Sequence, residues 1–143
     1  MQDALRERLN TLYAALRLGQ IDFILNALDD DIEFVSYAPI EVFPFLGHIR
    51  GKAAMAKLLQ DGYRQLEFVT YEPLSMVVES DHVAVQIFVR VVNRQSGRSV
   101  QVVVAHFLRF RGGKIVEIRE FMDSLRAAEQ ALGRRLVDVE TTA

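Results

Sequence analysis

The first third of the chain is patterned for amphipathic helices. Apolar residues recur every three or four positions near the start, at Leu5, Leu9, Leu12 and Leu16, with Tyr13 beside them. This spacing places them on one stripe of a helix that would face a core, and Gly19 is suited to end it. A short second helix is predicted over residues 21–28 and a third over residues 51–63.

The rest of the chain is patterned mainly for strands. Runs rich in β-branched and aromatic residues predict strands at 32–37, 68–72, 74–79, 83–92, 100–110 and 114–123. Residues 125–137 predict a C-terminal helix. Helices followed by a meander of strands indicate an α+β fold, with helices gathered on one side of a curved, mainly antiparallel sheet.

The loop between residues 38 and 50 carries more apolar groups than a surface crossing needs: Val42, Phe43, Phe45 and Leu46. A loop of this length commonly has a function or packs as a lid. We therefore expect Phe43, Phe45 and Leu46 to pack over or beside the mouth of a cavity.

The last two strands meet at Gly112-Gly113, which predicts a two-residue hairpin turn. Such a turn pairs Ala105 with Glu120 and His106 with Arg119. One face would then carry Val103, Ala105, Phe107, Ile118, Glu120 and Met122, and the other His106, Leu108, Arg119 and Phe121. Because both faces are largely apolar, we expect helices to cover the first face and a second subunit to cover the other.

Composition narrows the classes of function. The 143 residues suit one domain, residues 1–143, with a sizeable core. The net charge is −2 without a basic stripe, which argues against nucleic acid as a partner. There is no cysteine for a thiolate site, and no apolar run of membrane-spanning length. We expect a soluble, cytoplasmic protein with no membrane partner and no metal or other cofactor.

Several segments, in their order and spacing, resemble the SnoaL-like branch of the NTF2-like superfamily, whose members are often related to ketosteroid isomerase. They are residues 16–22, Asp30-Asp31, residues 47–52, residues 107–110, residues 113–115 and residues 119–123. The resemblance covers about residues 4 to 125. It implies an NTF2-like cone, in which a strongly curved sheet wraps around the N-terminal helices beside an apolar cavity, with a short C-terminal helix. It also implies a homodimer formed through the outer sheet face.

The resemblance does not fix a reaction. By alignment, the Asp base of ketosteroid isomerase falls at Ser36, and the Asp and Tyr of its oxyanion hole fall at Ala105 and at Leu12, one residue before Tyr13, so all three are absent. Limonene epoxide hydrolase is similar in the last strand, where its catalytic Asp falls on Glu120, but its other Asp and its Arg fall near Val89 and Ile87. Neither catalytic set is therefore complete.

Glu120 is the first candidate for chemistry, as a general acid or base. On an apolar face without a basic neighbour, burial should raise its pKa, so that Glu120→Gln would slightly stabilise the fold at neutral pH. Tyr13 is a candidate hydrogen-bond donor. The expected ligand-binding residues are Leu12, Leu16, Phe34, Ser36, Met55, Leu59, Val103, Ala105, Phe107, Ile118 and Met122. His106 is expected in the dimer interface, and Asp123 either caps the last helix or lines the cavity.

Two functions remain open at this stage. The first is an enzyme of isomerase, cyclase or hydrolase type that acts on a small hydrophobic molecule through Glu120. The alternative is a non-catalytic ligand-binding or dimerisation module. The substrate and the pathway cannot be read from the residues.

Overall fold

A computed structural model describes residues 2–138. Its elements, in chain order, are α1 (Gln2–Leu18), α2 (Ile21–Asn26), β1 (Leu28–Ser36), β2 (His48–Arg50), α3 (Lys52–Gln65), β3 (Leu66–Glu79), β4 (His82–Asn93), β5 (Ser99–Arg111), β6 (Lys114–Phe121) and α4 (Ser124–Leu132). The strands form one sheet in the order β2-β1-β6-β5-β4-β3. Every neighbouring pair is antiparallel except β1 and β6, which run parallel.

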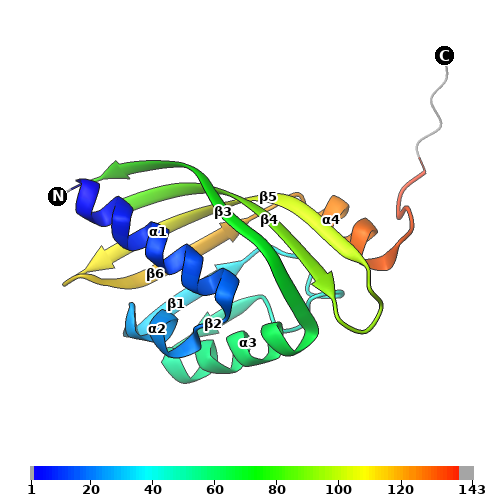
Figure 1. Ribbon diagram of the computed structural model, residues 1–143, viewed down its shortest axis with the longest axis horizontal. Coiled ribbons are helices and arrows are strands. Elements are labelled where there is room, and N and C mark those ends of the chain that lie inside the picture. The colour runs from blue at the N-terminus through cyan, green and yellow to red at the C-terminus, as the bar shows by residue number, and fades with distance from the viewer. Residues whose placement is uncertain (1, 139–143) are drawn as a thin grey trace, which may run out of the picture.

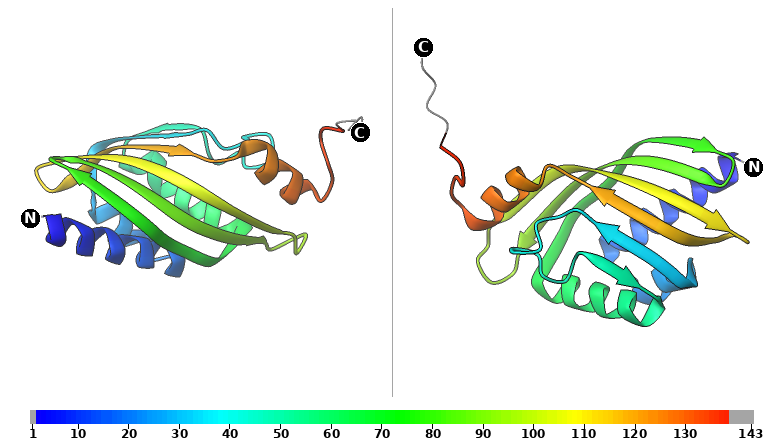
Figure 2. Two further views of the ribbon diagram at one scale, coloured as in Figure 1. Left: turned by 90° about the horizontal axis from the view of Figure 1, so that it is seen from above. Right: turned by 180° about the vertical axis from the view of Figure 1, so that it is seen from behind.

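The sheet is strongly curved, and α1, α2 and α3 lie on one side of it (Figures 1 and 2). This arrangement confirms the predicted α+β cone. Alternate residues of β4 and β5 face these helices and are buried: Val83, Val85, Ile87, Val89, Val91, Val100, Val104, His106, Leu108 and Phe110. The stripe on α1 meets them through Leu9, Leu12 and Tyr13, as its spacing predicts.

The β5–β6 hairpin has the predicted turn but not the predicted register. Gly112 and Gly113 both have positive φ, at 56° and 77°, as the two central residues of a type I′ turn require. Arg109 pairs with Glu117 and Phe110 with Ile115, so Val116 has no partner and forms a β-bulge.

Beyond the bulge, every pair in the hairpin is shifted by one residue from the expected register. His106 therefore lies opposite Glu120, and Phe107 opposite Arg119. A one-residue shift exchanges the two faces of a strand. The expected inward position of Val103, Ala105 and Phe107 is wrong, and so is the expected outward position of His106 and Leu108.

Several boundaries also differ from the sequence prediction. The second helix ends at Asn26 and β1 begins at Leu28, so Asp29-Asp30-Asp31 lies within a strand instead of following a helix, and residues 48–50 of the expected loop form β2. β3 runs unbroken through Pro73, because a register irregularity beside the proline absorbs the missing donor. α4 ends at Leu132, because Gly133 closes the helix with a φ of 70°, so the predicted helix over residues 125–137 is shorter than expected.

Candidate functional site

A chain of four polar side chains lies inside the protein. Among residues 3–138, the buried polar or charged side chains are Ser36, His106 and Glu120, which are 7%, 4% and 7% exposed. The Ser36 hydroxyl donates to Oε1 of Glu120 at 2.7 Å. Nε2 of His106 lies 2.7 Å from Oε2 of Glu120. Nδ1 of His106 lies 2.8 Å from the hydroxyl of Tyr13, which is 1% exposed. We call Ser36, Glu120, His106 and Tyr13 the relay.

Strand pairing places three of these residues together. Glu120 of β6 is the register partner of Ser36 on one side and of His106 on the other. The backbone N–H of Tyr37 donates to the Glu120 carbonyl at 2.9 Å, and that of Ala38 to the Ser36 hydroxyl at 3.2 Å. The end of β1 is thereby fixed against β6, and α1 adds Tyr13 from across the core.

The hydrogen bonds define where the protons lie. Burial by itself raises the pKa of Glu120, but the hydrogen bond and charge of His106 and the hydrogen bond from Ser36 outweigh it, so the pKa is lowered. An ionised Glu120 only accepts, so Nε2 of His106 carries a proton and donates it. When the ring is charged, both of its nitrogens donate; when it is neutral, Nδ1 instead accepts from the Tyr13 hydroxyl.

Aromatic rings continue from the relay along one wall. The ring of Tyr13 stacks between those of His106 and Tyr71, with centroids 5.7 and 5.8 Å away. Phe68 stacks on the far side of Tyr71 at 5.8 Å, and Tyr63 packs on Phe68 at 4.8 Å. Burial raises the pKa of Tyr13 well above its usual range, with a further contribution from the charge of Glu120, so its hydroxyl stays protonated.

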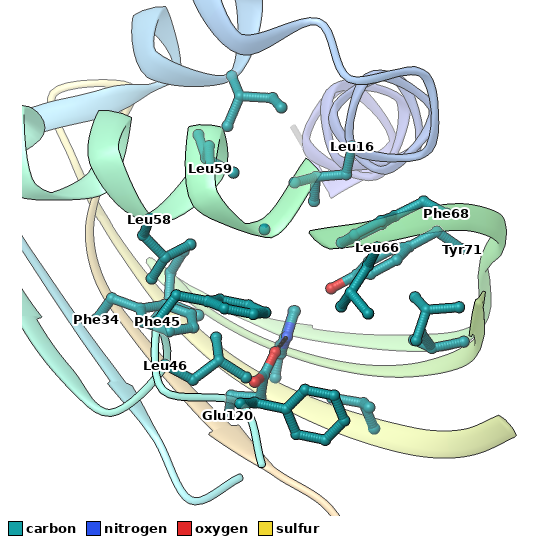
Figure 3. A pocket seen from close by; sticks show the side chains of 18 of the residues that line it. Leu16, Phe34, Phe45, Leu46, Leu58, Leu59, Leu66, Phe68, Tyr71 and Glu120 are labelled. Atoms are coloured by element: carbon teal, nitrogen blue, oxygen red, sulfur yellow. Dashed lines mark hydrogen bonds and ion pairs between the residues drawn. The ribbon is translucent and has the colours of Figure 1, made fainter. Parts of the chain in front are cut away.

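The relay lies at the wall of an apolar pocket between the helices and the sheet. The pocket has a volume of about 150 Å³ and includes Tyr13, His106 and Glu120 among its lining residues. Figure 3 shows Glu120 reaching into it among Phe34, Phe45, Leu46 and Leu58. Phe43, Phe45 and Leu46 all line it, which agrees with the position expected for the loop between β1 and β2.

Most of the predicted site residues lie at this pocket. Its lining contains Tyr13, Glu120, Leu12, Leu16, Phe34, Met55, Leu59, Ile118 and Met122. Ser36 lies behind Glu120 and contacts it directly. Val103, Ala105 and Phe107 do not line the pocket but lie on the outer face, where Val103 and Phe107 are 47% and 51% exposed. Asp123 caps α4 and accepts from the Arg126 N–H at 3.0 Å.

The expectation of a raised pKa for Glu120 is wrong, because it assumed that no basic residue lies opposite. The bulge turns His106 to the inner face, opposite Glu120. A signal for its true position exists in β4, where Gln86 and Arg90 are exposed and pair with Ala105 and Gln101. Polar residues at those places mark the outer face, and therefore place His106 on the inner one. Tyr71, from β3, was also missed.

Within residues 2–138, neither a metal centre nor a membrane span is found. No group of three or more His, Cys, Asp or Glu side chains there could hold a metal ion. No helix in that part of the chain is both long and apolar enough to cross a membrane.

The chain is similar to known proteins over most of its length. The profile of the SnoaL-like domain family matches residues 9–118. A protein of Rhodopseudomonas palustris named as a candidate isomerase is 29% identical, with a TM-score of 0.77 over 86% of this chain and 91% of that one. An NTF2-like protein of Burkholderia xenovorans is 26% identical, with a TM-score of 0.74 over 87% and 93%. An M. tuberculosis epoxide hydrolase described as LEH-like shares the fold, at 18% identity and a TM-score of 0.72 over 89% and 88%. No curated protein matches the chain.

Proposed function

Because the chain belongs to the SnoaL-like domain family, whose fold hosts more than one chemistry, we propose its function from its own site. The proposed function is that of an enzyme that moves a proton to or from a small, largely apolar organic molecule. The observation that carries the proposal is the relay, a fully hydrogen-bonded Ser36–Glu120–His106–Tyr13 chain at the wall of an apolar pocket. Isomerisation and cyclisation are reactions of this class.

The relay has the order needed for acid–base catalysis. Tyr13 lines the pocket and is hydrogen-bonded to Nδ1 of His106, so its hydroxyl can take a proton from a ligand while its own proton passes to Nδ1. The resulting imidazolium is stabilised by the Glu120 carboxylate, which Ser36 holds from the other side. Reversal of the same steps returns the proton to the ligand, at the same atom or at another. Glu120 thus acts as a positioning residue behind His106, and His106 replaces it as the acid–base group.

The pocket limits the size of the substrate. In another protein, an engineered apolar cavity of about 150 Å³ binds benzene, so a ligand built on one six-membered ring is the appropriate scale here. The aromatic wall formed by Phe68, Tyr71 and Tyr13 favours a planar ring.

Deuterium exchange tests the proposal without knowledge of the substrate. Single-ring ketones such as cyclohexanone and acetophenone are incubated with the protein in D₂O, and loss of their α-proton signals is followed by NMR. The wild type should accelerate exchange, and His106→Asn should lower the acceleration by about 100-fold or more, the usual contribution of a general acid or base. The control is His48→Asn, since His48 is exposed and bonded only to Glu33. Equal exchange in the wild type and His106→Asn would refute the catalytic role.

A non-catalytic ligand-binding module is the second candidate. The absence of the ketosteroid isomerase base at Ser36, and of its oxyanion-hole donors at Ala105 and Leu12, favours it. In the same experiment, ligands that bind to the wild type without any exchange would support this alternative.

We also propose a second copy of the chain as a partner, bound through the outer sheet face. Exposed aromatic side chains gather there: the rings of Tyr37 and Phe121 stack at 4.7 Å, and Phe107 meets Phe121 edge to face at 5.8 Å. A contiguous exposed apolar patch of this kind marks an interaction site. Arg119 and Phe121 remain in the proposed interface, whereas His106 and Leu108 are buried inside and leave it.

A further inference from the structure

Tyr71 brings a further hydroxyl to the pocket, on the opposite side of the Tyr13 ring from His106. Its ring lies nearly parallel to that of Tyr13, with 20° between the planes. Figure 3 shows the Tyr71 ring entering the pocket from β3, with its hydroxyl directed inward. Tyr71 is only part-buried, although its ring packs between Phe68 and Tyr13.

The hydrogen-bonding capacity of this hydroxyl is unused. Within residues 2–138, the Tyr13 hydroxyl bonds to His106 and the Tyr63 hydroxyl to the Leu16 carbonyl, whereas the Tyr71 hydroxyl has no hydrogen-bond partner. Every fully buried side-chain N or O atom in that range has a hydrogen-bond partner. Because the Tyr71 hydroxyl has none, its oxygen is not fully buried. The oxygen of Tyr71 therefore borders open space, and the space that Tyr71 borders is the pocket.

The Tyr71 hydroxyl is fixed as a donor. Burial, together with the charge of Glu120, raises its pKa well above the usual range, so it stays protonated at any physiological pH. Most of the surrounding side chains offer it nothing to bond, because the pocket wall is made largely of Leu, Val and Phe. Once a ligand fills the pocket and excludes water, a donor in these apolar surroundings is costly to leave unbonded, unless the ligand supplies the acceptor.

We infer that Tyr71 is a specificity-determining residue, which donates a hydrogen bond to an oxygen atom carried by the ring-sized ligand. This inference rests on the proposed function, since it requires a ligand in the same pocket. The substrate class is thereby narrowed from apolar molecules in general to those with an acceptor oxygen, such as a ketone or a cyclic ether. Pure hydrocarbons are selected against.

A pair of matched probes tests this. Acetophenone and α-methylstyrene have the same shape, but only acetophenone carries an acceptor oxygen. Their dissociation constants are measured by ¹⁵N–¹H NMR titration for the wild type, Tyr71→Phe and Tyr63→Phe. The preference for acetophenone should fall about five-fold in Tyr71→Phe, which corresponds to about 1 kcal/mol for one neutral hydrogen bond. It should not change in Tyr63→Phe, which removes a hydroxyl already satisfied by Leu16.

A second measurement needs no comparison of affinities. The carbonyl stretch of bound acetophenone should lie at lower frequency in the wild type than in hexane, and should move back toward the hexane value in Tyr71→Phe. An unchanged preference or an unshifted stretch would overturn the role of Tyr71 while leaving ligand binding and the relay intact. If neither probe binds to the wild type, the proposed function and this inference fail together.

Discussion

Glu120→Gln tests whether the buried carboxylate stabilises the fold or strains it. The substitution keeps the shape of the side chain and removes its charge. The amide oxygen can still accept from Nε2 of His106, and the amide N–H₂ can donate to the Ser36 oxygen. What changes is that two hydrogen bonds to a charged group, both 2.7 Å long, become neutral ones.

The expected effect at neutral pH is a loss of stability. The pKa of Glu120 is lower in the folded protein than its ordinary value of 4.5, so the folded state favours the ionised form. Each charge-assisted bond contributes about 1 kcal/mol more than a neutral one, and relief of the buried charge offsets part of the total. We therefore expect Glu120→Gln to lower the free energy of unfolding by about 1–2 kcal/mol, or the Tm by about 3–8 °C.

The pH dependence of the free energy of unfolding tests the direction of the Glu120 pKa shift independently. A carboxyl with a lowered folded-state pKa contributes stability above its unfolded pKa, and this contribution is lost as the pH falls through the folded-state value. Wild type and Glu120→Gln should therefore differ most at neutral pH and converge below the ordinary value of 4.5. Urea unfolding at a series of pH values, followed by circular dichroism, measures both.

Glu117→Gln is the matched control. Glu117 lies on the same strand but on the outer face, in a partly exposed pair with Arg119 at 3.3 Å. Its substitution should change stability by less than about 0.5 kcal/mol. If Glu120→Gln is as stable as the wild type at neutral pH, or more stable, then burial outweighs the hydrogen bonds and the assignment of an ionised Glu120 is wrong.

Three further predictions concern the relay and the outer face. Ser36→Ala removes the donor to Oε1 of Glu120, so the pKa of Glu120 should rise and stability at neutral pH should fall by about 1–2 kcal/mol. The pKa is measured by ¹³C NMR titration of the Glu120 carboxyl, and the stability by urea unfolding. His106→Phe leaves a buried carboxylate with one partner and should lower the free energy of unfolding by about 3–5 kcal/mol. In urea unfolding, adding Glu120→Gln should restore part of this stability, and strictly additive effects in the double variant would contradict the pairing. Phe121→Asp should convert the proposed dimer to a monomer in analytical ultracentrifugation, whereas Leu18→Asp, at an exposed position at the end of α1, should not. A wild-type protein that is monomeric at micromolar concentration would exclude the interface.

The fold could be predicted from the sequence because its elements have clear periodicities. The stripe on α1 and the alternation in β4 each determine which side chains face the core. The Gly112-Gly113 turn was also readable, since two positive φ angles at a hairpin tip favour glycine.

The composition of the site could be predicted only in part, because one residue controls the register. Ile115 and Val116 are both apolar, and a regular strand and a bulge are equally compatible with that pair. Without the bulge, Glu120 would lie opposite Ala105 and have no partner. With it, Glu120 lies opposite His106, and the direction of its pKa shift is reversed. Tyr71 was not predicted for a different reason. β3 has two register irregularities, and across the first of them strict alternation would put Phe68 and Tyr71 on opposite faces, whereas both line the pocket.

The parallel pairing of β1 with β6 has a consequence for how the protein folds. Ser36 and Glu120 are 84 residues apart in sequence, and Tyr13 and His106 are 93 apart. Contacts of such long range form only after the entropy of closing large loops has been overcome, which makes them slow. The two arms of the β5–β6 hairpin can associate early, since His106 and Glu120 are only 14 residues apart. The proposed acid–base site is complete only when β1 and α1 have docked onto that hairpin, so recovery of the proposed activity during refolding should follow recovery of the hairpin's secondary structure.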